Sequence, residues 1–299
     1  MKSMKFFALV AAITLNTFNA HADSLFDYTV YTKEGVLSAR SNILGDVGSG
    51  GPIDLRHFLI GGDIFSAESV RFNSGTVQGR IIAPDVRLSN GEAWDGIRER
   101  NPFSRSDLNR FAREMDSLSA RLARLPNSIE ARVQRGTLMI VANPNRETNV
   151  LNISARDFEA SGNLYFSGHA NSVFVINISG NTARFANKGI LLEKRGGGRP
   201  LLGNIIFNFV DATDVLIQSS GVPLSETVST QIGPQSVGIP ATILAPYADV
   251  IFREASLTGA IFAKALRSVS KREDLLSVRG GQINAWCFAA ADLDIGCYR

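Results

Sequence analysis

The chain has 299 residues, 44% of them hydrophobic, and a formal charge of only +3. This length suits one large domain or two small ones, and no linker rich in proline and serine divides it, so we expect a single domain. So small a net charge gives no electrostatic argument for a nucleic-acid partner.

The first 22 residues have the pattern of a signal peptide. Two lysines are followed by an apolar run over residues 6–15 and by the small-residue cleavage sequence Ala20-His21-Ala22. The apolar run is too short to span a bilayer. We therefore expect cleavage between Ala22 and Asp23 and an exported protein that is secreted, periplasmic or held at the cell surface.

Residues 42–91 contain short apolar segments separated by glycine. The dipeptide Gly-Asp occurs at Gly45-Asp46 and again, 17 residues later, at Gly62-Asp63. Glycine at such points permits tight corners and close approach of neighbouring backbone. This spacing is typical of a β-solenoid, in which each coil buries its apolar residues against the coils on either side.

Residues 104–125 break this pattern and predict an amphipathic helix. Apolar residues recur at steps of three and four, Ser104 or Ser106 can cap the N-terminus, and Pro126 ends the run. We expect the helix to lie along the solenoid and shield one side of it. The stripe that it buries consists of Leu108, Phe111, Met115, Leu118, Leu122 and Leu125.

Arginine is in local excess around this helix. Residues 97–135 carry nine arginines against five acidic residues. A solvated helix face is the favoured explanation, and an anion-binding patch is the alternative.

Strand signals resume after the helix and continue almost to the end of the chain. The segments are short, β-branched or aromatic, and bounded by Asn, Gly or Asp. Ile243-Leu244-Ala245 recurs as Ile261-Phe262-Ala263 after 18 residues, and residues 77–88 carry a phrase similar to that of residues 242–252. The sequence therefore predicts a mainly β fold, a β-helix or solenoid with one long amphipathic helix packed alongside.

Cys287 and Cys297 are the only cysteines, and both lie in the last 13 residues. In an oxidising compartment we expect them to form a disulfide bond that closes a small C-terminal loop. A metal pair is the alternative, although zinc usually takes four ligands and His57 and His169 are far away in sequence. The predicted organisation is a signal peptide over 1–22, a solenoid domain over 23–285 with its helix at 104–125, and a disulfide-closed tail over 286–299.

Three phrases in this order are similar to the choice-of-anchor A domain family: Asn177-Ile178-Ser179-Gly180, residues 206–213 and residues 243–250. The resemblance covers roughly residues 25–285. It implies an exported bacterial surface or adhesive module of the kind whose C-terminal anchor varies between members. The layout, with a helix beside the coils, is also similar to that of ice-binding β-solenoids.

Residues 292–299 contain no sortase motif, apolar helix or basic tail, and no lipobox cysteine lies near Ala22, so no anchor is predicted. We likewise expect no integral membrane segment in the mature chain.

Candidate catalytic groups are sparse. Asp63, Asp85, Asp211 and Asp249 could form an acid pair or a calcium site if their coils stack, but each lies in or beside a Gly or Pro turn, where Asp caps backbone N–H groups. The threonines repeat at no fixed interval, which disfavours an ice-binding array. We therefore predict no catalytic, metal or cofactor residue.

The favoured function is a non-enzymatic adhesion or surface-interaction module that binds an extracellular protein or polysaccharide. A carbohydrate-active enzyme on the same scaffold and a structural envelope or matrix component are the alternatives.

Overall fold

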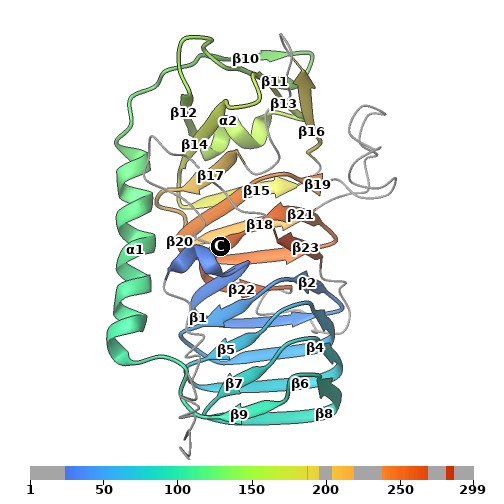
Figure 1. Cartoon of the computed structure of the whole chain (residues 1–299). Coiled ribbons are helices and arrows are strands. Elements are labelled where there is room, and N and C mark those ends of the chain that lie inside the picture. The colour runs from blue at the N-terminus through green and yellow to red at the C-terminus, as the bar shows by residue number, and fades with distance from the viewer. Residues whose placement is uncertain (1–23, 187, 195–203, 219–237, 269–280, 286–299) are drawn as a thin grey trace, which may run out of the picture.

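The computed structural model describes residues 24–186, 188–194, 204–218, 238–268 and 281–285. Parallel strands stack into three ladders, so the chain forms a β-solenoid with three faces and one long helix alongside (Figure 1). The fold class predicted from the sequence is confirmed. We call the three ladders face A, face B and face C.

Each face is built from one strand, or one part of a long strand, of each coil. Face A comprises β12 (Thr148–Ser154), β14 (Val173–Ser179), β17 (Ile205–Phe209), the starts of β20 (Thr242–Arg253), β22 (Ile261–Arg267) and β1 (Val30–Ala39), then β3 (Val47–Ser49), β5 (Ile64–Ser66), β7 (Ile81–Ala83) and β9 (Ile97–Glu99). Face B comprises β15 (Thr182–Ala186), β18 (Asp214–Gln218), the ends of β20, β22 and β1, and the starts of β4 (Ile53–Ile60), β6 (Ser69–Val77) and β8 (Asp85–Ala93). Face C comprises β19 (Gly238–Ile239), β21 (Ser256–Gly259), β23 (Gln282–Ala285), β2 (Asn42–Leu44) and the ends of β4, β6 and β8.

A smaller four-stranded sheet completes the end of the solenoid that lies at the top of Figure 1. Its strands are β10 (Ala131–Gln134), β11 (Thr137–Val141), β13 (Leu164–Gly168) and β16 (Ile190–Lys194). The short helix α2 (Ala155–Ala160) places Phe158 in the core of this end, where its ring lies 5.7 Å from that of Phe185.

The solenoid is assembled from two parts of the chain that meet in its middle. After the short 3₁₀ helix η1 (Leu25–Asp27), the chain starts in the middle with β1, descends to β9, returns to the top along helix α1 (Arg105–Ala123), and descends again to β22 (Figure 1). There β22 pairs with β1, with Ile261 beside Val30 in parallel register. Neither β1 nor this closure was predicted from the sequence.

Helix α1 lies along face A, as the sequence predicts. Ser104 caps it through a capping box with Asp107, Arg124 is the C-cap residue, and Pro126 follows. Phe111, Met115, Leu118 and Leu122 are buried, and Leu108 and Leu125 are partly buried against the same cluster. The outward side chains of face A point toward α1 and are also largely apolar. The helix and face A therefore bury one another.

The repeats seen in the sequence are coil repeats. Ile243, Leu244 and Ala245 lie in register with Ile261, Phe262 and Ala263, which confirms the 18-residue spacing as one coil. Residues 77–88, whose sequence is similar to that of residues 242–252, build a similar coil. Within them, β7 (Ile81–Ala83) also lies on face A and is followed by the turn onto face B.

The Gly-Asp phrases form a ladder at the corner between face C and face A. Asp46 Oδ1 accepts a hydrogen bond from the N–H of Asp63 at 2.7 Å, one coil away. A Cβ on Gly62 would lie 2.1 Å from that same oxygen, so a glycine is required there. The aspartate of one coil thus caps the backbone of the next, and glycine makes the space for it.

Candidate functional site

The four aspartates singled out in the sequence do not form a cluster. Asp63 continues the corner ladder: its Oδ1 accepts from the N–H of Arg80 at 2.7 Å, and its Oδ2 pairs with the Arg80 guanidinium. This hydrogen bond raises the pKa of Arg80 above its usual value. Asp211 Oδ1 accepts from the N–H of Gly180 at 2.7 Å. For Asp63 and Asp211 the expected capping role is therefore confirmed.

Asp85 and Asp249 both lie on face B but are too far apart for joint catalysis. Five strand-to-strand steps, from β20 through β22, β1, β4 and β6 to β8, separate them along one column of side chains. At about 4.8 Å per step, their strands are roughly 24 Å apart. A pair of glycosidase carboxylates is separated by only about 5 to 10 Å.

Asp214 is the carboxylate that does lie beside Asp249, and the sequence analysis missed it. The two occupy the same register position on β18 and β20. Asp249 is bound to Arg267 at 3.2 Å and Lys264 at 3.5 Å, so its charge is already compensated. The signal was present in the sequence, because Asp85, Asp214 and Asp249 are each followed by valine at the start of a face B strand.

His57 and His169 are both exposed. His57 has a φ of 57° and lies at the corner between face B and face C. Arg40, Ser74 and Asn90 have the same left-handed conformation at intervals of about one coil, so His57 belongs to a corner ladder. His169 is exposed, and its N–H donates to Ser172 Oγ at 2.9 Å.

Lys188 is a buried amine that the sequence analysis did not identify. Its side chain donates to the carbonyl oxygen of Glu159 at 3.2 Å and to that of Ser161, just after α2. Burial lowers the pKa of Lys188. Because these carbonyl groups satisfy the ammonium group, Lys188 acts as a cap on α2 and not as a nucleophile.

A row of asparagines fixes α1 to face A. Asn152, Asn177 and Asn208 lie in register on β12, β14 and β17. Asn208 Nδ2 donates to Asn177 Oδ1, and Asn177 Nδ2 donates to Asn152 Oδ1, both at 2.8 Å. Asn208 also exchanges hydrogen bonds with Ser119 of α1, and Asn177 donates to the carbonyl oxygen of Leu122.

The asparagine row binds α1, so its outward polar side chains stabilise the fold. The repeated phrase Asn-Ile-Ser at residues 152 and 177 was the sequence signal for it.

Face B carries charged side chains in register and is not the face that α1 covers. One outward column runs through Arg184, Leu216, Ile251, Arg267, Leu37, Asp54, Arg71 and Arg87.

Where the two parts of the chain meet, face B has a hollow of about 210 Å³. Gly35 and Pro52 line it, and Glu34, Asp54 and Arg267 add charges of both signs to the lining.

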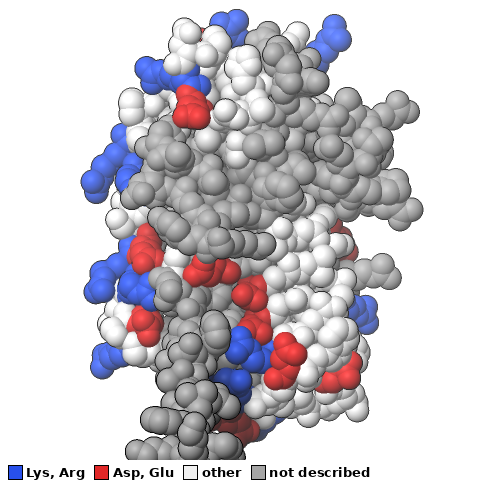
Figure 2. All heavy atoms as spheres, in the orientation of Figure 1, with Lys and Arg blue, Asp and Glu red and all other residues white. Residues whose placement is uncertain are grey.

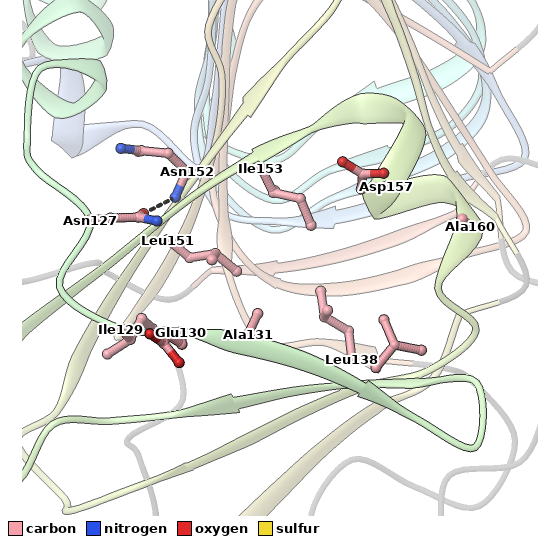
Figure 3. A pocket seen from close by; sticks show the side chains of 11 residues that line it. Asn127, Ile129, Glu130, Ala131, Leu138, Leu151, Asn152, Ile153, Asp157 and Ala160 are labelled. Atoms are coloured by element: carbon pink, nitrogen blue, oxygen red, sulfur yellow. Dashed lines mark hydrogen bonds between the residues drawn. The ribbon is translucent and has the colours of Figure 1, made fainter.

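A larger cavity of about 560 Å³ opens at the top of the solenoid, beside β10 and α2 (Figure 3). Leu151 and Ile153 lie on one side of it and Ala131 and Leu138 on the other. The lining also includes the polar residues Asn127, Glu130, Asn152 and Asp157. Apolar walls with a few polar groups are typical of a ligand pocket, and no residue of this pocket was identified from the sequence.

Several predicted features lie outside the described residues: the cleavage site Ala22 and Asp23, and the cysteines Cys287 and Cys297. Within the described residues, no group of three or more His, Cys, Asp or Glu side chains could hold a metal ion. None of the helices in the described part of the chain is long and apolar enough to cross a membrane.

Two solved structures are similar to the chain. One is the crystal structure of an ice binding protein from an Antarctic biological consortium, with 17% identity, a TM-score of 0.35 and 95% coverage of each chain. The other is an ice binding protein from an Antarctic bacterium of the Flavobacteriaceae, with 12% identity, a TM-score of 0.35, and coverage of 91% of this chain and 81% of that one. No curated protein matches the chain.

One family model matches residues 95–273, which include α1 and the coils from β10 to β22. This match spans more than half of the chain. The protein therefore belongs to the family described as "Putative Ice-binding-like adhesive domain".

Proposed function

We propose that the protein is an exported, non-enzymatic adhesion or surface-interaction module of the choice-of-anchor A type, and that it binds an extracellular polysaccharide or protein through face B. Membership of an adhesive-domain family supports the adhesive role. The observation that carries the choice of face is that α1 buries face A, whereas face B presents charged side chains in fixed register on a rigid scaffold.

The lower part of face B carries three charged residues in register on neighbouring strands. Arg71 and Arg87 lie in register on β6 and β8, both are exposed, and Asp54 lies beside Arg71 on β4. Arginine offers several N–H donors in a fixed plane, which suits hydroxyl, carboxylate and amide groups of a polymer. The coils fix the backbone beneath these residues, so the spacing between their Cα atoms is set before any ligand binds.

Ice is a second candidate ligand, given the family's description, but the side chains of face B do not favour it. An ice-binding face is expected to carry a flat, regular array of threonines. Among the described strands of face B, Thr182 is the only threonine. The corresponding positions on the neighbouring coils hold Asp214 and Asp249.

The test uses the mature chain on arrays of neutral and charged polysaccharides and of extracellular matrix proteins. The matched variants are Arg71→Ser with Arg87→Ser on face B, and Arg132→Ser with Arg135→Ser on the exposed β10 hairpin. We expect binding that the face B pair abolishes and the hairpin pair preserves. Release of reducing sugar from any array member, or thermal hysteresis with no polymer binding, would overturn the proposal.

A further inference from the structure

The solvent side of α1 carries a row of exposed arginines. Phe111 and Met115 mark the buried side of the helix. Arg113 and Arg124 are eleven residues apart, about three turns, so they lie on the same side of α1 and roughly 16 Å from one another. Arg121 lies about one turn before Arg124. All three are exposed, and Figure 2 shows Lys and Arg atoms along the left edge, where Figure 1 places α1.

The acidic residues of α1 are occupied elsewhere. Asp107 binds Ser104 and Arg110, and these hydrogen bonds lower its pKa. Glu114 accepts from the N–H of Leu25 at 3.3 Å and pairs with Arg110.

Asp116 pairs with Lys33 of β1 at 2.5 Å. Within the part of the chain that the structure describes, Arg113, Arg121 and Arg124 therefore have no acidic partner at ion-pair distance. Positive charge is thus concentrated on the solvent side of the helix.

The row leads to a hollow just beyond the C-terminus of α1. The hollow has a volume of about 410 Å³ and is lined by Leu125, Pro126, Ser128, Arg146, Glu147, Thr148 and Val150. Arg146 is exposed, and its guanidinium has no ion-pair partner among the described residues. Apolar walls beside an arginine suit a sugar ring that carries an acidic group. Glu147 also lines the hollow and repels an anion, so Arg146 is the residue that favours an acidic group there.

We propose that the solvent side of α1 and this hollow form a binding track for a linear anionic polysaccharide. Three arginines on a straight helix contact successive acidic groups of an extended polymer, and Arg146 binds one more at the end of the helix. The track is on a different surface from face B, so it goes beyond the proposed function and can be tested separately.

The chemistry of the surface favours a polysaccharide over other polyanions. No large hydrophobic side chain of α1 is exposed, so the helix has no apolar group to insert into an anionic membrane. Helix α1 itself carries no exposed aromatic ring on which a base of a single-stranded nucleic acid could stack, and the exposed ring of Tyr247 beside the helix already contacts Asp116 and Lys33.

The experiment measures binding of the mature chain to heparin, with dextran as the neutral polysaccharide. The track variant is Arg113→Gln with Arg121→Gln and Arg124→Gln. The charge-matched control is Arg132→Gln with Arg135→Gln and Arg156→Gln, three exposed arginines on the β10 hairpin and α2, away from both α1 and face B. We expect the track variant to lose roughly tenfold or more in heparin affinity, since each lost charge-assisted contact weakens binding. The control should keep its affinity, and wild-type binding should weaken as salt rises. All six arginines are at least partly exposed, so both variants should fold, and circular dichroism checks this.

Equal losses in the two variants would overturn the track, because they would show attraction by net charge alone. Wild-type binding to phosphatidylglycerol vesicles or to duplex DNA that exceeds binding to heparin would also overturn it. Retained heparin binding by the face B pair Arg71→Ser with Arg87→Ser, together with loss of its array ligands, would support both surfaces independently.

Discussion

Ala39 and Ser268 are joined by a buried hydrogen bond across 229 residues of sequence: the N–H of Ala39 donates to Ser268 Oγ at 3.0 Å. Both residues are fully buried. The bond lies where β22, at the end of the second part of the solenoid, meets β1, at the start of the first. The two parts of the chain therefore stabilise one another.

Ser268→Ala removes the acceptor of this bond and leaves the Ala39 N–H buried without a partner. We expect a loss of about 1 to 3 kcal/mol in the free energy of unfolding. Ser89→Ala, the same change at an exposed position of β8, should stay within about 0.5 kcal/mol of wild type. Urea unfolding followed by circular dichroism measures both, and equal midpoints for the two variants would contradict a stabilising role for this junction.

Phe111→Asp places a charge where α1 meets the rings of Tyr28, Tyr31 and Phe103. An unpaired buried charge should cost on the order of 3 to 5 kcal/mol. The control Ser117→Asp lies near the centre of the solvent side of the same helix and should change stability by less than about 0.5 kcal/mol. Thermal melts compare the two, and an unchanged melting temperature for Phe111→Asp would show that α1 is not docked in solution.

Asn208→Leu should release the C-terminal half of α1. The change leaves the Ser119 side chain and carbonyl oxygen and Asn177 Oδ1 without their partner in a buried site, at an expected cost of about 3 kcal/mol. Hydrogen exchange should show faster opening over residues 115–123. The double variant with Ser119→Ala should lose less than the sum of the single changes, and strict additivity would argue against direct coupling.

We expect Tyr28 to contribute to the loss of the protein's stability at alkaline pH. Burial raises the pKa values of Tyr28 and Tyr31 above the usual value of about 10. An unfolded tyrosine loses its proton near pH 10 while the folded one keeps it, so the stabilisation is complete below pH 10 and is lost as pH rises above it. The expected slope is about 1.4 kcal/mol per pH unit for each tyrosine.

Tyr28→Phe should make this slope shallower. It should be neutral or slightly stabilising at pH 7, because Tyr28 Oη is buried without a hydrogen-bond partner among the described residues. Unfolding measured from pH 7 to 11 tests both statements, and a slope equal to that of wild type would refute the assignment to Tyr28.

The two termini can be tested in one measurement. The intact mass of exported protein, without reduction, should correspond to a chain that begins at Asp23 and lacks two hydrogens, from a bond between Cys287 and Cys297. Export exposes the thiols to an oxidising compartment, which is the reason to expect the bond. An intact Met1 or free thiols would each contradict the corresponding prediction.

The sequence by itself determined the features that depend on local spacing. The 17- and 18-residue repeats gave the coil, because a solenoid places equivalent residues of successive coils in register, as Ile243 and Ile261 show. The steps of three and four between Leu108 and Leu125 gave the helix and its buried side, because that period puts all six residues on one face.

Only the tertiary structure decided how distant segments meet. Nothing in the residues around Val30 indicates that β22 will pair with them, since backbone hydrogen bonds between parallel strands carry little sequence information. The wide separation of Asp85 and Asp249, the asparagine row under α1 and the cavity beside β10 likewise follow from the order in which the coils stack. That order depends on the return of the chain along α1, which closes one solenoid from two parts and assigns each face its neighbours.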